Sequence, residues 1–123
     1  MAMQLAALIM LAGLPQPGSL VAGRGLPLLP NGHQLSISLG SLADCDTGGR
    51  LWPSAIVHCQ WQATAVEELA GSSILDLGTG TGAVGLYAAC LGATRVLSDG
   101  GSDALLSLAR QNAAANEPLW SIH

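Results

Sequence analysis

The stretch Ile74-Leu75-Asp76-Leu77-Gly78-Thr79-Gly80-Thr81-Gly82 decides the fold of this 123-residue chain. A short apolar run ends beside a carboxylate, and glycine then occupies every second position. The next residues, 83–91, have the composition of a helix. Glycines let the backbone turn tightly and approach a bound molecule, and the helix directs free N–H groups toward it. A strand, a glycine loop and a helix in this order predict the ligand-binding corner of an open α/β fold.

A second strand and a further helix follow this corner. Residues 94–98 predict a strand that stops at Asp99, and Ser102 is placed to cap a helix over residues 103–114. Two strands joined through a helix give a right-handed crossover and adjacent parallel strands. The first strand, 73–77, is almost continuously apolar, which suits a strand covered on both faces. The fold class is therefore α/β, a parallel sheet with flanking helices.

The upstream part of the chain carries weaker signals. Residues 1–30 contain repeated Pro and Gly punctuation, so we expect a poorly ordered or non-core extension there and a domain over 31–123. Residues 35–39 alternate apolar and polar side chains, as in a half-buried strand, and residues 40–49 are typical of a polar loop. A helix is expected over residues 53–70, with proline in its first turn and one buried stripe.

Composition excludes several classes of function. Half of the residues are hydrophobic and 10% are charged, which favours a packed core over disorder. The four basic residues are scattered arginines in a chain of net charge −4, so we expect no nucleic-acid partner. The three cysteines lack CxxC spacing, which favours reduced thiols of an intracellular protein over a disulfide framework or a metal site.

The apolar N-terminus lacks the features of a membrane or targeting segment. Residues 1–14 have no positively charged start, are too short to cross a bilayer and are followed by Pro15 and Pro17. We therefore expect no membrane partner and no cleaved targeting segment. The expected location is the cytoplasm, with the nucleus as the alternative.

Two carboxylates, Asp76 and Asp99, end the expected parallel strands and so lie at the edge where open α/β sheets bind ligands. An acid about 20 residues beyond a glycine loop can accept both hydroxyls of a ribose. The literal GxGxxG over residues 80–85 would fit a nicotinamide cofactor. However, a fixed carboxylate at Asp76 would repel a pyrophosphate and would suit a ligand that carries an ammonium group.

These residues resemble a known family. Residues 75–82 resemble the first motif of class I, seven-strand S-adenosylmethionine-dependent methyltransferases, and Asp99 resembles their acidic residue at the end of the second strand. Residues 50–55, Arg-Leu-Trp-Pro-Ser-Ala, and residues 99–116, with Asn112 and Asn116 among others, resemble one subgroup, the protein-lysine methyltransferases of non-histone targets. The resemblance implies a Rossmann-like fold, of which this chain holds the first strands and helices.

The resemblance also implies roles for the matching residues, with S-adenosylmethionine as the cofactor. The residues implied to bind the cofactor are Trp52, Asp76, Gly78, Gly80, Thr81, Gly82 and Asp99. Asp99 would bind the ribose hydroxyls, Asp76 and the glycine loop the methionine part, and Trp52 would pack beside the cofactor. Structural alternatives stay open: Trp52 as a packing residue at a helix start, Asp76 as an acid that ties down loop N–H groups, and Asp99 as a helix cap.

The half of the family's site that borders the methyl acceptor has no counterpart in this sequence. In the family an Asp-x-x-Tyr motif ends the fourth strand, whereas the one tyrosine here, Tyr87, lies in the helix after the glycine loop. We therefore expect the cofactor-binding half of a protein-lysine N-methyltransferase, inactive alone, with no catalytic residue or metal ligand assigned and with a protein lysine as acceptor once completed. Two alternatives are an inactive cofactor-binding or interaction fragment and a fragment of a nicotinamide-dependent oxidoreductase.

Overall fold

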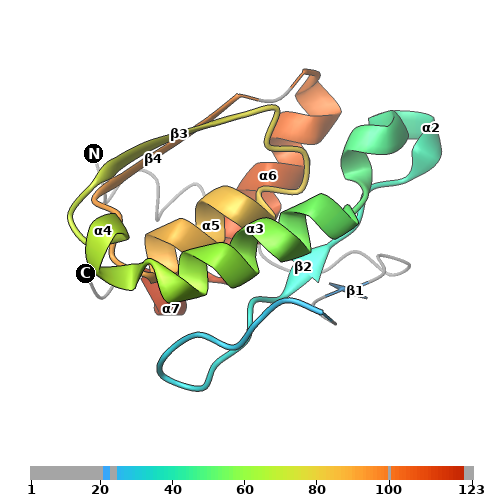
Figure 1. Cartoon of the computed structure of the whole chain (residues 1–123). Helices are drawn as coiled ribbons and strands as arrows, with labels where there is room; N and C mark the ends of the chain where they lie inside the picture. The colour runs from blue at the N-terminus through green and yellow to red at the C-terminus, as the bar shows by residue number, and fades with distance from the viewer. Residues whose placement is uncertain (1–20, 23–24, 100, 121–123) are drawn as a thin grey trace.

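The computed structural model describes residues 21–22, 25–99 and 101–120. Its centre is a βαβ unit, in which β3 (Ser73–Leu77) leads through the glycine loop into α5 (Ala83–Cys90) and then to β4 (Arg95–Asp99). The two strands lie side by side (Figure 1). They run parallel and in register, with Leu77 opposite Asp99 at their carboxyl ends. The predicted order of strand, glycine loop, helix and parallel strand is therefore confirmed.

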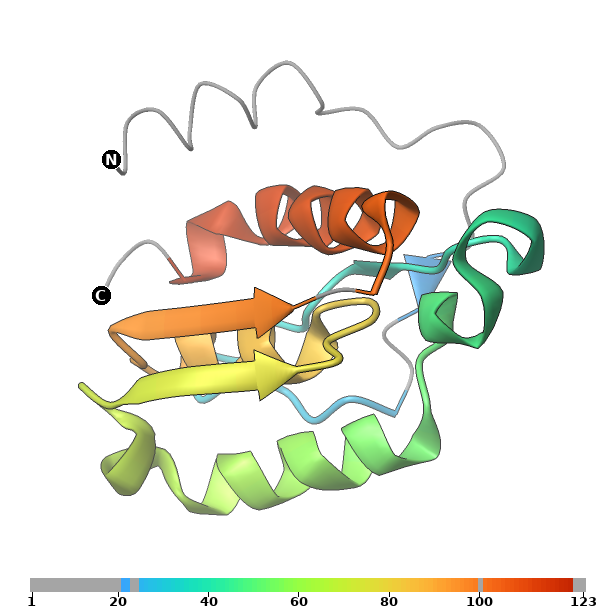
Figure 2. The ribbon, with the colours of Figure 1, turned by 90° about the horizontal axis from the view of Figure 1, so that it is seen from above.

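The two faces of the strand pair are covered unequally. Figure 2 shows α5 behind the strands, with α3 (Pro53–Thr64) along one side and α6 (Asp103–Ala115) along the other. On the opposite face, Leu75 is 59% exposed and Leu77 is 70% exposed. The apolar sequence of β3 predicted cover on both faces, and the described residues cover only one.

The helix expected over residues 53–70 is divided into α3 and the short α4 (Val66–Leu69). The Thr64 hydroxyl donates a hydrogen bond to the Trp61 carbonyl at 2.7 Å, and that carbonyl is the one that the Ala65 N–H would use in a continuing helix. The Ala65 N–H instead donates to the Gln62 carbonyl at 3.0 Å. The helical turn therefore tightens and breaks at Ala65.

The upstream segment differs from the prediction in two ways: its strand is shorter, and its expected loop contains helical turns. β2 (Ile37–Ser38) pairs antiparallel with β1 (Val21–Ala22), in place of a strand over residues 35–39. The expected polar loop contains α2 (Leu42–Cys45) and the 3₁₀ helix η1 (Asp46–Gly49). The polar residues there cap a helix, because the Ser41 side chain accepts the Asp44 N–H at 3.1 Å and donates to the Asp44 carboxylate at 2.7 Å.

α6 begins where the sequence predicted. The Ser102 hydroxyl accepts the Leu105 N–H at 3.2 Å, which is the geometry of an N-terminal helix cap. The helix ends at Ala115, one residue beyond the expected end, and the short α7 (Glu117–Trp120) follows.

Two buried asparagines, Asn112 of α6 and Asn116 directly after the end of that helix, bind the backbone of Ser36 and Ser38. The Asn112 Oδ1 accepts the Ser38 N–H at 2.7 Å, and the Asn112 Nδ2 donates to the Ser38 carbonyl at 3.0 Å. Asn116, one helical turn later, makes the same pair of bonds with Ser36, at 2.8 Å each. The two side-chain amides therefore act as a neighbouring strand would, and the Asn112 amide satisfies backbone groups of the buried Ser38 that would otherwise lack partners.

The apolar core lies among α3, α5 and the upstream segment. Tyr87 of α5 and Ile37 of β2 are fully buried in it, and the Tyr87 hydroxyl donates to the Leu28 carbonyl at 3.1 Å. Leu26 and Leu29 are buried in the same core, although they lie within the extension that was expected to be non-core. No helix in the described part of the chain is long and apolar enough to cross a bilayer.

Candidate functional site

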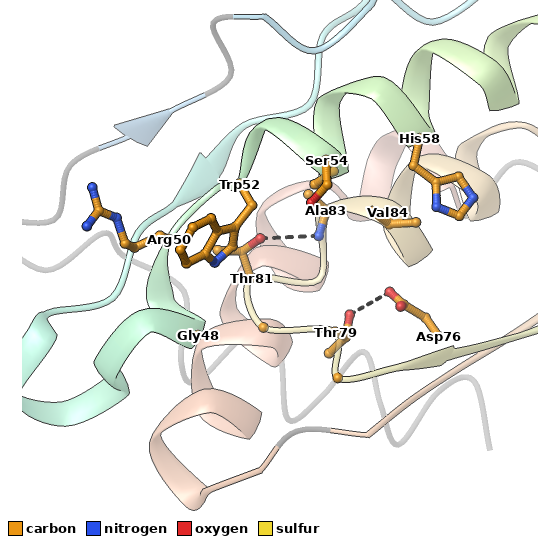
Figure 3. A pocket seen from close by; sticks show the side chains of 13 residues that line it. Gly48, Arg50, Trp52, Ser54, His58, Asp76, Thr79, Thr81, Ala83 and Val84 are labelled. Atoms are coloured by element: carbon orange, nitrogen blue, oxygen red, sulfur yellow. Dashed lines mark hydrogen bonds between the residues drawn. The ribbon is translucent and has the colours of Figure 1, made fainter.

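A cleft of about 250 Å³ opens at the carboxyl end of β3, between the glycine loop and the beginning of α3 (Figure 3). We call its two sides the loop wall and the helix wall. The loop wall consists of Asp76, Gly78, Thr79, Gly80 and Thr81. The helix wall consists of Arg50, Trp52, Ser54, Ala55 and His58, and the remaining lining residues are Gly48, Ala83 and Val84. Open α/β sheets bind their ligands at this edge.

The loop wall depends on glycines whose backbones adopt the left-handed conformation. Gly78 has φ +67° and Gly80 has φ +55°, values that side-chain-bearing residues adopt only at a cost. A Cβ atom on Gly80 would lie 2.6 Å from the Gly48 carbonyl oxygen, so this glycine also permits a close approach to η1. A Cβ on Gly78 would meet no atom within 4 Å, so the backbone of Gly78 borders open space.

Asp76 fastens the glycine loop to the helix that follows it. Its Oδ2 accepts the Thr79 hydroxyl at 2.8 Å and the Gly85 N–H at 3.1 Å (Figure 3 shows the contact with Thr79). Gly85 lies in the first turn of α5, where backbone N–H groups have no partner within the helix. The acid therefore has the structural role that the sequence left open, and it also lines the cleft.

Thr81 and Gly82 complete the turn into α5, and they differ in what they face. The Thr81 side chain lines the cleft and accepts the Ala83 N–H at 3.4 Å. Gly82, at φ +84°, is the residue that precedes the helix, and a Cβ there would lie 3.7 Å from Ala109 of α6. Of the glycines predicted to bind the cofactor, Gly82 therefore packs toward α6 and does not line the cleft.

Trp52 is a half-exposed residue of the helix wall and does not belong to the core. Its side chain is 50% exposed, and its Nε1 donates to the Thr47 carbonyl of η1 at 3.1 Å. The Arg50 guanidinium carbon lies 6.0 Å from the centre of the indole ring, at the outer limit for a cation–π contact. The indole therefore joins η1 to the start of α3 and keeps an aromatic side chain at the cleft.

Sequence reasoning missed most of the helix wall. Ser54 and His58 lie one turn apart on α3 and both line the cleft, although neither was among the site residues predicted from the sequence. The His58 ring also lies 5.6 Å from the ring of Trp61. The available signal was the four-residue spacing of these two polar side chains after Trp52, which places them on one helix face.

Asp99 ends β4 directly beside the end of β3, as predicted for the acid of the second strand. Its side chain lies outside the described part of the structure. Its contact with a ribose therefore stays a prediction.

Two buried thiols, Cys59 of α3 and Cys90 of α5, lie in elements that pack against each other beside the cleft. Burial, followed by the negative charge of Asp76, raises the pKa of Cys59 to about 12, and burial raises the pKa of Cys90 to about 12. Both thiols are therefore neutral near pH 7 and lack the thiolate that a nucleophile needs. The described residues contain no group of His, Cys, Asp and Glu side chains that could hold a metal ion.

A parallel βαβ unit with a glycine loop and an acid at its mouth defines an α/β protein of the open-sheet type, a class that binds ligands at the carboxyl ends of its strands. Residues 31–122 match the lysine methyltransferase family, and the chain belongs to that family. The family membership gives no support to the nicotinamide oxidoreductase alternative.

Three curated relatives illustrate the similarity. Protein N-lysine methyltransferase METTL21A of Xenopus tropicalis is 37% identical over 73 residues, which are 59% of this chain and 33% of the relative. Protein-lysine methyltransferase METTL21E of Mus musculus is 34% identical over 70 residues, 55% of this chain and 28% of the relative. EEF1A lysine methyltransferase 3 of Mus musculus is 30% identical over 87 residues, 71% and 37% respectively. The chain thus spans about a third of the length of these relatives.

Proposed function

We propose that this chain is the cofactor-binding part of an S-adenosylmethionine-dependent protein-lysine methyltransferase, with the cleft as the cofactor site. The observation that carries the proposal is the Asp76 carboxylate, which is held at the mouth of a glycine loop and lines the cleft. A fixed negative charge at this point favours a ligand with an ammonium group over one with a pyrophosphate.

The residues of the cleft suit the two ends of such a cofactor. Asp76 and the bare backbone of the loop wall would hold the methionine part, and the half-exposed indole of Trp52 would pack beside it. Asp99, at the end of the neighbouring strand, would bind the ribose hydroxyls. Gly82 would act indirectly, because it sets the turn into α5. We also propose that the complete protein has the family's seven-stranded Rossmann-like sheet, and that this chain holds its first strands.

The cofactor would supply a methyl group on a sulfonium sulfur: an acceptor nitrogen would attack the methyl carbon in line with the C–S bond, and S-adenosylhomocysteine would be the leaving group. Catalysis of that step depends on positioning and on the exclusion of water. We assign no methyl acceptor to a residue of this chain, and we expect cofactor binding without turnover. The name of the third relative specifies a lysine of EEF1A as the target of that protein. By analogy we propose a protein lysine as the acceptor class of the completed enzyme, in the cytoplasm or nucleus.

Calorimetric titration of the purified chain tests this proposal. We expect S-adenosylhomocysteine to bind more tightly than NADH, and Asp76→Asn to weaken the binding of S-adenosylhomocysteine. Asp44→Asn is a matched control, because Asp44 also accepts a hydroxyl but lies in α2 outside the cleft. Preferential binding of NADH would overturn the assignment of the cofactor. Methyl transfer from radiolabelled cofactor to a protein extract would overturn only the expectation that the chain lacks turnover.

A further inference from the structure

We infer that Asn112 of α6 is a positioning residue for the cleft, because it fixes the carbonyl of Thr81 in the loop wall while it holds the backbone of residue 38. The inference rests on the proposed function only in treating the cleft as the cofactor site. Its structural part, that one side chain sets the loop, does not depend on the ligand.

The Asn112 side chain uses each of its hydrogen-bonding groups. Its Nδ2 donates to the Thr81 carbonyl at 2.8 Å and to the Ser38 carbonyl at 3.0 Å, and its Oδ1 accepts the Ser38 N–H at 2.7 Å. Asn112 is fully buried, and Thr81 and Ser38 are buried as well. Since water cannot replace these bonds in the buried site, the loss of one leaves a polar group without a partner.

The bond to Thr81 fixes the orientation of a peptide plane in the loop wall. Asn112 holds the carbonyl of Thr81, and the N–H of the next residue, Gly82, donates to the Thr79 carbonyl at 2.9 Å. Carbonyl and N–H belong to one rigid plane, so two bonds at its opposite sides prevent the plane from turning. This plane directly precedes α5, and therefore Asn112 determines how the loop wall meets the helix.

Asn116 provides an internal comparison. It makes the same two bonds to Ser36 that Asn112 makes to Ser38, and it is equally buried. Its remaining Nδ2 bond, however, runs to the Asn112 carbonyl within α6 at 2.7 Å and not to the glycine loop. The two asparagines therefore share the role of holding residues 36–38, and only Asn112 connects that segment to the cleft.

The first experiment compares Asn112→Ser with Asn116→Ser in the full chain without ligand. We expect both variants to unfold at lower urea concentration, because both lose bonds to the upstream segment. Hydrogen exchange of the Gly82 amide should become at least tenfold faster in Asn112→Ser, relative to core amides of the same variant. In Asn116→Ser that ratio should stay within twofold of the wild type. Equal ratios in the two variants would overturn the inference.

The wild type gives the answer if Asn112→Ser does not fold. Native-state exchange at low urea follows the Nδ2 protons of Asn112 and the amide of Gly82 in one sample. We expect both to exchange through one opening event, with the same dependence on urea. Opening of Gly82 while the Asn112 protons remain protected would contradict a positioning role.

Titration with S-adenosylhomocysteine separates this inference from the proposed function. We expect Asn112→Ser to weaken binding at least tenfold and Asn116→Ser to change it by less than threefold. Failure of the wild type to bind would count against the proposed function, whereas the exchange experiments would still decide the role of Asn112. Equal weakening in both variants would reduce Asn112 to a residue that stabilises the fold alone.

Discussion

The two walls of the cleft are built in different ways. On the loop wall, left-handed glycines, the Asp76 carboxylate and the Asn112 amide fix the backbone at successive positions. On the helix wall, the side chains of Trp52, which precedes α3, and of His58, within α3, are exposed. One hydrogen bond of the Trp52 indole joins the start of α3 to η1. A preformed loop loses little conformational freedom when a ligand binds. We therefore expect changes in the loop wall to have the larger effects on stability, and changes in the helix wall to lower binding with only a small effect on stability.

The largest effect is expected where the loop wall touches η1. Gly80→Ala would place a Cβ 2.6 Å from the Gly48 carbonyl at a φ of +55°, and we expect it to lower the free energy of unfolding by about 3 kcal/mol. Gly78→Ala is the matched control, because its φ is +67° but its Cβ would meet no atom within 4 Å. It should cost about 1 kcal/mol. Urea unfolding measures both, and equal losses would show that the approach to η1 is not tight.

The next effect separates the two roles of Asp76. Asp76→Ala removes the acceptor of the Gly85 N–H, so we expect a loss of about 1–2 kcal/mol in stability together with loss of cofactor binding. Asp76→Asn keeps an acceptor oxygen but removes the charge. It should therefore retain most of the stability and still lose affinity for S-adenosylhomocysteine. Full affinity in Asp76→Asn would mean that the carboxylate serves the loop and not the ligand.

A pH dependence is expected from the thiols beside the cleft. The pKa of Cys59 and that of Cys90 are each about 12 in the folded chain, above their ordinary value of 9.0. The unfolded chain therefore releases these protons first as pH rises, so stability is complete below about pH 9 and falls toward pH 12. Unfolding measured at pH 7, 9 and 10 should show this decline, and Cys90→Ala should make it shallower. An unchanged slope in Cys90→Ala would assign the decline to other groups.

The smallest effect on stability is expected in the helix wall. Trp52→Phe removes the hydrogen bond to Thr47 from a half-exposed side chain, which should cost about 0.5–1 kcal/mol. Trp52→Ala should weaken the binding of S-adenosylhomocysteine. Trp61 is the control, because it lies in α3, the helix that Trp52 precedes, and is 57% exposed but does not line the cleft. If Trp61→Ala weakened binding as strongly as Trp52→Ala, the effect would belong to α3 and not to the cleft.

The parts of the molecule that could be predicted from sequence are those governed by neighbouring residues. The strand, glycine loop and helix around Asp76, the parallel pairing of β3 with β4 and the cap at Ser102 all follow from local rules. The break at Ala65 depends on the hydrogen bond of the Thr64 hydroxyl, and α2 depends on the cap at Ser41. Polar side chains of this kind are equally common in loops, so the sequence does not predict either feature.

The parts that could not be predicted depend on residues far apart in the chain. Asn112 meets Ser38 across 74 positions and Thr81 across 31 positions, contacts that no local pattern reveals. The sequence grouped Gly82 with the other glycines of the loop, but only the packing of α6 shows that it faces away from the cleft. Ser54 and His58 of the helix wall were missed for a similar reason, since they become lining residues only once α3 lies beside the loop.

Asn112 of α6 and Asn116 at the end of that helix also affect how β2 behaves toward other molecules. A strand with a free edge offers unpaired N–H and C=O groups on which a second polypeptide can add, and this is a common origin of aggregation. β1 pairs with one edge of β2. On the other edge, the Asn112 amide binds the backbone of Ser38, and the Asn116 amide binds the backbone of Ser36, the residue before β2. Two side chains one helical turn apart thus occupy the backbone groups of Ser36 and Ser38, to which another polypeptide could otherwise add as a strand.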